Sequence, residues 1–159
     1  MKVSAKADYA VRAAAELAAA QSDRPVKAER IADAQGIPIK FLEAILLELK
    51  HAGVVKSTRG ADGGYALARP ASEIAIADVI RAVDGPLANV RGERPEDAKY
   101  QGSAENLTKL WVAVRAALRE VLEQTSLADL VNGKFPPRVR NLTDVPDAWQ
   151  SGRGRGMGN

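Results

Sequence analysis

Apolar residues in the first third of the chain recur at helical spacing in three segments. The first segment, over residues 4–20, begins with Ser4, a favourable N-cap residue. The second, over residues 27–34, is short and is followed by Gly36, which suits a left-handed helix terminus. The third, over residues 38–51, opens with a proline. Two short helices joined by a few residues that include a glycine predict a helix-turn-helix.

The pattern then changes from helical to extended. Residues 54–58 are mostly β-branched or hydroxylated and predict a strand, and residues 65–67 predict a second one. Between them, residues 59–64 contain three glycines and predict a turn. A helix-turn-helix followed at once by a β-hairpin is a winged helix. We therefore expect a winged helix-turn-helix domain over residues 1–86, closed by a short helix over residues 77–84.

The second half of the chain predicts an arm. Residues 87–103 are polar, lack periodicity and predict a linker loop. Residues 104–125 predict the longest helix, capped by Ser103, and a last short helix ends at residue 132. The apolar stripe of the long helix consists of Leu107, Leu110, Trp111, Val114, Leu118, Val121 and Leu122. The stripe predicts either a two-fold dimer interface or packing against the chain's own domain. Residues 133–159 predict a flexible basic tail that ends in a glycine-arginine repeat.

Composition narrows the chemistry. The 159 residues are 46% hydrophobic but only 4% aromatic, which favours a mainly α fold with a small β-hairpin wing. The sequence has no cysteine and one histidine, so it excludes disulfides, cysteine-ligated clusters and a multi-histidine metal site. We expect no metal and no cofactor. No window approaches the roughly 18 apolar residues of a membrane span, and no signal peptide is evident, so we expect a cytoplasmic protein.

Charge is unevenly distributed along the chain. The formal net charge is +3 overall, yet residues 1–69 carry +3, residues 70–132 carry −3 and residues 133–159 carry +3. Basic ends around an acidic middle are typical of a polyanion-binding protein, although ordinary fluctuation among solvated charges gives the same pattern.

The predicted third helix and the hairpin carry the candidate DNA contacts. A recognition helix needs polar groups opposite its core stripe, because the major groove displays the full base code. Glu43 is a base reader in this interpretation, or else an exposed carboxylate paired with a neighbouring lysine. Arg59 at the hairpin tip could enter the minor groove, or could simply be a turn residue. The full set expected to contact double-stranded DNA is Lys2, Lys6, Lys27, Pro38, Ile39, Lys40, Glu43, Lys56, Ser57, Arg59 and Gly60.

Residues 57–67, Ser-Thr-Arg-Gly-Ala-Asp-Gly-Gly-Tyr-Ala-Leu, resemble the wing of the Rrf2 family of bacterial repressors, the group of IscR, NsrR and CymR. Residues 1–4, 41–43 and 80–86 are also similar to that family. The resemblance covers about residues 1–132. It implies a homodimer whose long helix crosses to the partner subunit, base reading by Glu43 and minor-groove insertion by Arg59.

The chain departs from many members of that family at one point. Those members hold an iron–sulfur cluster with three cysteines in the loop that corresponds to residues 89–102, where this chain has none. Asp8 lies where some members supply a carboxylate ligand, and we expect it to be a helix-surface residue here. The chain is thus similar to the cysteine-free, CymR-like branch. That likeness implies a role in sulfur or cysteine metabolism and control by a partner enzyme of cysteine synthesis or a small-molecule effector.

Two other function classes compete with a DNA-binding repressor. A winged helix can serve as a protein-interaction module without specific DNA binding, although such a module need not keep a basic wing. An enzyme is not expected, because His51 is isolated at a helix end and the glycines at positions 60, 63 and 64 do not form a phosphate-binding loop. Tyr100 and Trp111 could line an effector pocket, or Trp111 could belong only to the apolar stripe.

Overall fold

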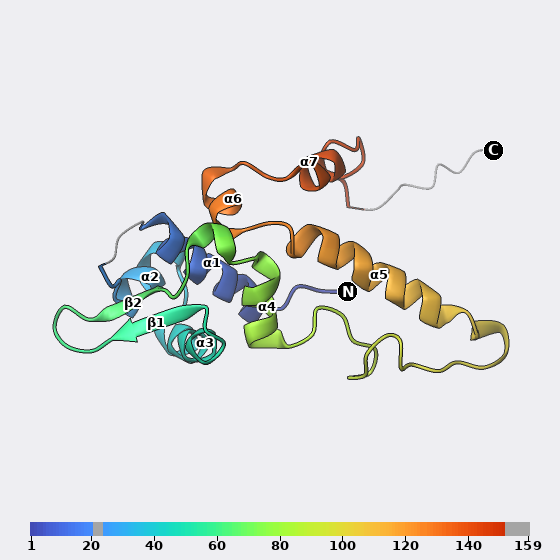
Figure 1. Ribbon diagram of the computed structural model, residues 1–159, viewed down its shortest axis with the longest axis horizontal. Helices are drawn as coiled ribbons and strands as arrows, with labels where there is room; N and C mark the ends of the chain where they lie inside the picture. Colours follow the sequence, from blue (N-terminus) through green and yellow to red (C-terminus); the bar gives the residue numbers. More distant parts are fainter. Residues whose placement is uncertain (21–23, 152–159) are drawn as a thin grey trace.

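The computed structural model describes residues 1–20 and 24–151 (Figure 1). Its helices are α1 (Ala5–Ala19), α2 (Ala28–Gln35), α3 (Ile39–His51), α4 (Ile76–Asp84), α5 (Leu107–Leu122), α6 (Leu127–Asn132) and α7 (Pro137–Thr143). Its strands are β1 (Val55–Thr58) and β2 (Gly64–Leu67), and short 3-10 turns cover Ala71–Glu73 and Gly102–Ala104. The order of elements confirms a mainly α fold with a hairpin wing after the helix-turn-helix.

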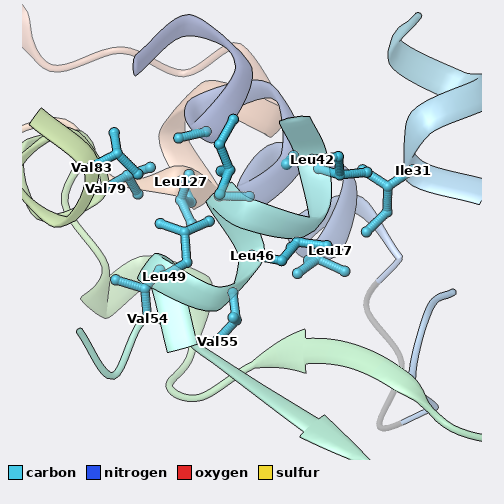
Figure 2. Close-up of a cluster of buried hydrophobic side chains, with 14 of the residues drawn as sticks. Leu17, Ile31, Leu42, Leu46, Leu49, Val54, Val55, Val79, Val83 and Leu127 are labelled. Carbon is cyan, nitrogen blue, oxygen red and sulfur yellow. The ribbon is translucent and has the colours of Figure 1, made fainter. Parts of the chain in front are cut away.

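Helices α1 to α4 and the hairpin surround one hydrophobic core, to which α6 adds the buried side chain of Leu127 and the partly buried Leu130 and Val131 (Figure 2). Leu42, Ile45, Leu46 and Leu49 form one face of α3 and are at most 1% exposed. Leu127 of α6 is fully buried in the same cluster. The three- and four-residue spacing of the α3 leucines and isoleucine is therefore the pattern that buries this helix.

The helix ends follow from single residues. Ser4 caps α1: its Oγ accepts a hydrogen bond from the backbone N–H of Ala7 at 2.9 Å and donates one to Asp84 at 2.5 Å, at the end of α4. Gly36 ends α2 with φ +62°, in the left-handed region expected for it. Ser126 and Asp129 form the reciprocal capping box of α6. The helix-end residues predicted at Ser4 and Gly36 are confirmed.

The segment after α4 and helix α5 together form the arm, which runs away from the core and then back to it. The segment after α4 runs outward, and α5 runs back beside it toward α6 (Figure 1). No residue of α5 is buried. The helix begins at Leu107 and not at residue 104, because Gly102–Ala104 form a 3-10 turn, so the prediction that Ser103 caps it was wrong. At its other end, the backbone carbonyl of Thr125 accepts a hydrogen bond from Ile76 N at 2.8 Å, which ties the arm to α4.

Two segments are more ordered than the sequence indicated. The linker over residues 87–103 buries Pro95 and Ala98, and the Ala98 carbonyl accepts a 2.6 Å hydrogen bond from Thr108 Oγ1 of α5. Residues 133–159 were expected to form a flexible tail, yet they contain α7, with a proline in its first turn and an ion pair from Arg138 to Glu120 of α5 at 3.0 Å. The glycine-arginine repeat, residues 152–156, lies outside the described residues.

Candidate nucleic-acid interface

Helix α3 presents an exposed face opposite its buried stripe. Lys40 and Glu43 are exposed on this face, and Ile39 is 36% exposed at the start of the helix. Ile37, only 4% exposed, anchors the turn just before Pro38 and so fixes where the helix begins. The buried stripe and the anchored turn hold Lys40 and Glu43 in fixed positions on a rigid scaffold.

Glu43 forms no ion pair among the residues that the structure describes. In residues 1–20 and 24–151, neither Lys40 nor Lys50, the two lysines nearest to it on this face of α3, forms an ion pair or a hydrogen bond with the Glu43 carboxylate. An unpaired carboxylate on a face rich in lysine is available to accept a hydrogen bond from outside the protein. The alternative in which Glu43 pairs with one of these lysines is not what the structure shows.

Two apolar side chains on α3 are exposed beyond the predicted contacts: the sequence placed Leu47 on the DNA-facing side without a contact role and did not place Phe41 there. Phe41 is 64% exposed and Leu47 is 51% exposed. Both lie outside the stripe spaced by three and four residues, and this was the available signal that they are not core residues. Leu47, one turn after Glu43 on the same face, can contact thymine methyl groups in a major groove.

The turn of the hairpin exposes Arg59 and Gly60 at its tip. Strands β1 and β2 pair antiparallel, with Val55 opposite Leu67 and Thr58 opposite Gly64. Gly60 has φ +105°, a conformation that favours glycine. The described residues contain no ion pair that involves Arg59. Its guanidinium is therefore presented at the end of a two-stranded ribbon, free to meet a partner.

The first residues of β2, just after the turn of the hairpin, are fastened to the segment before α2. Val26 and Tyr65 exchange two backbone hydrogen bonds of 2.7 and 2.8 Å. A Cβ added to Gly64 would lie 2.5 Å from the carbonyl oxygen of Val26, so only glycine permits this approach. In the sequence, the pair of glycines at positions 63 and 64 indicated a turn, but it did not reveal that Val26 pairs with this strand. The hairpin and the helix-turn-helix are consequently one rigid unit.

The predicted phosphate contacts differ in availability. Lys2, Lys27 and Lys56 are exposed. Lys6 instead forms a 2.7 Å ion pair between its Nζ and Glu48 of α3. A phosphate group would have to compete with Glu48 for this amine, and the competition weakens the case for Lys6 as a direct contact.

Comparisons with known proteins agree with this geometry. The Rrf2 family model, described as iron-dependent transcriptional regulators, matches residues 3–133. A candidate HTH-type transcriptional regulator of Mycobacterium tuberculosis, Rv1287, is 50% identical over 153 residues, which are 96% of this chain and 95% of that protein.

Two solved structures are also similar. The structure of CymR (YrzC), the global cysteine regulator of B. subtilis, superposes with a TM-score of 0.71 at 32% identity and covers 84% of this chain and 98% of its own. T. potens IscR superposes with a TM-score of 0.67 at 35% identity and covers 84% of this chain and 88% of its own.

The residues of this chain do not fit an iron centre. The sequence has no cysteine, and the described residues bring together no group of three histidine, aspartate or glutamate side chains able to hold a metal ion. His51, the single histidine, is exposed at the end of α3. Asp8 is exposed on α1 and forms a 3.0 Å ion pair with Arg12 one turn later. Both candidate ligands thus lie on helix surfaces.

In the described ranges, no helix is long and apolar enough to cross a membrane.

Proposed function

Because this chain belongs to the Rrf2 family of transcriptional regulators, we propose that it acts as a repressor that binds a pseudo-palindromic operator as a homodimer. The observation that carries the proposal is the exposure of Lys40, Glu43 and Arg59 on elements whose other sides are fixed by the core and by Val26. Rigid presentation matters because base contacts lose their discrimination when the side chains that make them are free to move.

The exposed groups would contact different parts of the DNA. Lys40 at the start of α3 can contact a phosphate or a guanine edge, and Glu43 one turn later can accept from cytosine N4. Arg59 is suited to a narrow, electronegative minor groove beside the site that α3 occupies. Lys2, Lys27 and Lys56 would neutralise phosphates and position the domain without specifying sequence.

The arm supports the proposed homodimer. Helix α5 has no buried residue, and the side chains of its apolar stripe remain half-buried or exposed in the single chain. Leu110 in the stripe is 54% exposed. A second copy related by a two-fold axis would cover the stripe of both subunits and set the distance between two recognition helices.

The proposal for which genes are regulated rests on the similarity to CymR. The solved structure of CymR carries the description of a global cysteine regulator, which favours a role in sulfur or cysteine metabolism here. On this proposal the chain has no catalytic activity, works on DNA in the cytoplasm, and responds to a small molecule or to a partner enzyme of cysteine synthesis.

The proposal is tested by fluorescence anisotropy with the DNA upstream of the protein's own gene and a scrambled control. Between about 50 and 200 mM salt, affinity for the natural DNA should fall by orders of magnitude. Arg59→Ala should cost about tenfold or more on the natural DNA. Lys56→Ala should weaken binding to both DNAs alike and lower the salt slope by about one. Lys109→Ala on the exposed side of α5 is the matched charge control and should change neither affinity.

Glu43→Ala separates base reading from general attraction. Removing a carboxylate near phosphates should leave affinity for scrambled DNA unchanged or slightly raised, while affinity for the natural DNA falls. Equal binding of natural and scrambled DNA by the unmodified protein, or an unchanged affinity after Arg59→Ala, would contradict the assignment. Binding that is insensitive to salt would instead favour a protein-interaction module.

A further inference from the structure

A pocket of about 440 Å³ lies between the end of α4, the segment that follows it and the middle of α5. Its charged lining consists entirely of arginines: Arg81 comes from α4, Arg94 from the linker, and Arg115 and Arg119 from α5. Pro86 and Leu87 supply part of the apolar wall. The four guanidinium groups are separated by up to 38 positions in the sequence, and the return of α5 beside the linker brings them together (Figure 1).

Two carboxylates, each shared by two arginines, partly neutralise this cluster. Glu123 Oε1 accepts hydrogen bonds from Arg81 and from Arg119 Nε, the latter at 3.0 Å. Glu96 pairs with Arg115 through Oε2 and with Arg94 Nε through Oε1 at 3.3 Å. Four guanidinium groups therefore face two carboxylates, which leaves an excess of two positive charges at the pocket.

The excess is maintained at neutral pH. The hydrogen bond from Arg81, followed by that from Arg119, lowers the pKa of Glu123. A backbone hydrogen bond, opposed by desolvation and assisted by Arg115, lowers the pKa of Glu96. Both carboxylates stay ionised, and arginine does not lose its proton in proteins. Since each guanidinium has five N–H donors, the ion pairs leave most of them unused.

We propose that this pocket binds a small anion of about two negative charges, carried on phosphate, sulfate or carboxylate groups. The planar donor fork of arginine matches such oxyanions, and convergence of arginines from separate elements is the arrangement that recognises them. The pocket volume is in the range of small-molecule sites. Tyr100 and Trp111, which the sequence suggested for an effector pocket, are not among its lining residues.

The pocket joins the two parts of the molecule. Arg81 belongs to the winged-helix domain, whereas Arg115 and Arg119 belong to the arm. An anion held by all three would fix the angle between the DNA-binding domain and the arm. In a dimer, that angle sets the spacing of the two recognition helices. This effector role rests on the proposed function, while the binding of the anion does not.

Isothermal titration calorimetry on the full chain tests the site. Sodium phosphate and sodium succinate are titrated in separate arms, with sodium chloride at matched ionic strength as the blank. The two arms distinguish a phosphate-type from a dicarboxylate-type ligand, and saturable binding in either one supports the proposal. Absence of saturable heat in both arms, or equal heat with chloride, would overturn it.

The double variant Arg94→Gln/Arg119→Gln gives the most specific test of the anion site. It removes the most exposed guanidinium from each shared pair and leaves Glu96 with Arg115 and Glu123 with Arg81, so no carboxylate loses its only partner. The pocket then carries no excess charge, and affinity should fall at least tenfold. The matched control is Arg138→Gln/Arg140→Gln, which removes two charges from α7 outside the pocket. Equal loss of binding in both double variants would overturn the site.

The effector role has its own readout. DNA anisotropy is measured with and without the anion that binds, at constant ionic strength, for the unmodified protein and for Arg94→Gln/Arg119→Gln. A change of threefold or more in DNA affinity that the double variant abolishes would support it, and an unchanged affinity would contradict it. If the protein bound no DNA at all, the proposed function would fail while the calorimetry still decided the anion site.

Discussion

The winged-helix domain and the arm differ in how deeply their longest-range contacts bury apolar side chains. In the domain, α3 buries four side chains that are at most 1% exposed, and core residues from α1, α2 and α4 close around them. In the arm, the longest helix of the described chain has no buried residue, and it contacts other segments through two shared carboxylates, the Thr108 hydrogen bond to the Ala98 carbonyl and partial packing of Leu122 against the core. The domain closes its core within one chain, whereas the arm leaves its apolar stripe half-buried or exposed.

This difference shows how one chain can combine a rigidly packed domain with a helix whose apolar side is left open. Burial of apolar area fixes the domain, because every displacement of α3 would open the core. The arm is held to the domain by the backbone hydrogen bond from Ile76 to Thr125 and by charged groups, and the pairing of these charged groups depends on solvent and on any bound anion. Regulation is therefore expected at the joint between them, where Arg81 meets Glu123.

The first prediction contrasts one leucine from each region. Leu46→Ala in the core should lower the free energy of unfolding by about 2–5 kcal/mol, since it leaves a cavity at a fully buried site. Leu110→Ala on the arm should lower it by less than about 1 kcal/mol at protein concentrations where the chain is monomeric. Urea unfolding followed by circular dichroism measures both, and equal losses would show that the two regions share one core.

The second prediction asks what covers the arm. Leu110→Glu places a charge in the apolar stripe and should convert the dimer to a monomer in sedimentation velocity, with the helical signal retained. Interface truncations at central apolar positions cost about 2 kcal/mol or more, which is a change of about thirtyfold in dissociation constant. Ala116→Glu, an equal charge change at an exposed position on the opposite side of α5, is the control and should leave the dimer intact.

The third prediction concerns the fastening of the hairpin to the domain. Gly64→Ala brings a Cβ to 2.5 Å from the Val26 carbonyl oxygen and should destabilise the protein by about 1–3 kcal/mol while loosening the wing. Gly60→Ala, with φ +105° and nothing within 4 Å, should cost only the backbone strain of about 1 kcal/mol. Hydrogen exchange at Tyr65 N–H reports the difference, and equal protection in the two variants would contradict the role given to Val26.

The domain could be predicted from the sequence because its signals are local. Ser4 and Gly36 mark helix ends by their own conformational preferences, and the spacing of the α3 core residues gives its buried face. The end of the chain could not be predicted in the same way. Helix α7 has a polar sequence, and its position depends on a contact with α5 that no local pattern indicates.

The candidate DNA-contacting residues were predictable for the same reason, but the pocket was not. Arg59 and Glu43 stand out by their position on a turn and on a helix face. Arg81, Arg94, Arg115 and Arg119 lie on three segments, and their convergence depends on how α5 returns beside the linker. In the sequence they resemble ordinary solvated charges in a region of net negative charge, so the pattern conceals a basic site.

The smallest predicted effect tests the charged joint itself. The pKa of Glu123 is lowered from its ordinary value of 4.5, first by the Arg81 hydrogen bond and then by that of Arg119. A lowered pKa in the folded state means that the pairing stabilises the protein above pH 4.5, and that this contribution is lost as the pH falls from 4.5 through the folded-state pKa. Glu123→Gln should therefore make stability, measured by urea unfolding at pH 7 and pH 3.5, less dependent on pH. Arg81→Gln and Arg119→Gln should each have the same kind of effect, because each removes one of the hydrogen bonds that lower this pKa. If Arg119→Gln reduced the pH dependence and Arg81→Gln did not, the joint would depend on contacts within α5 and the arm would not be coupled to α4 through this carboxylate.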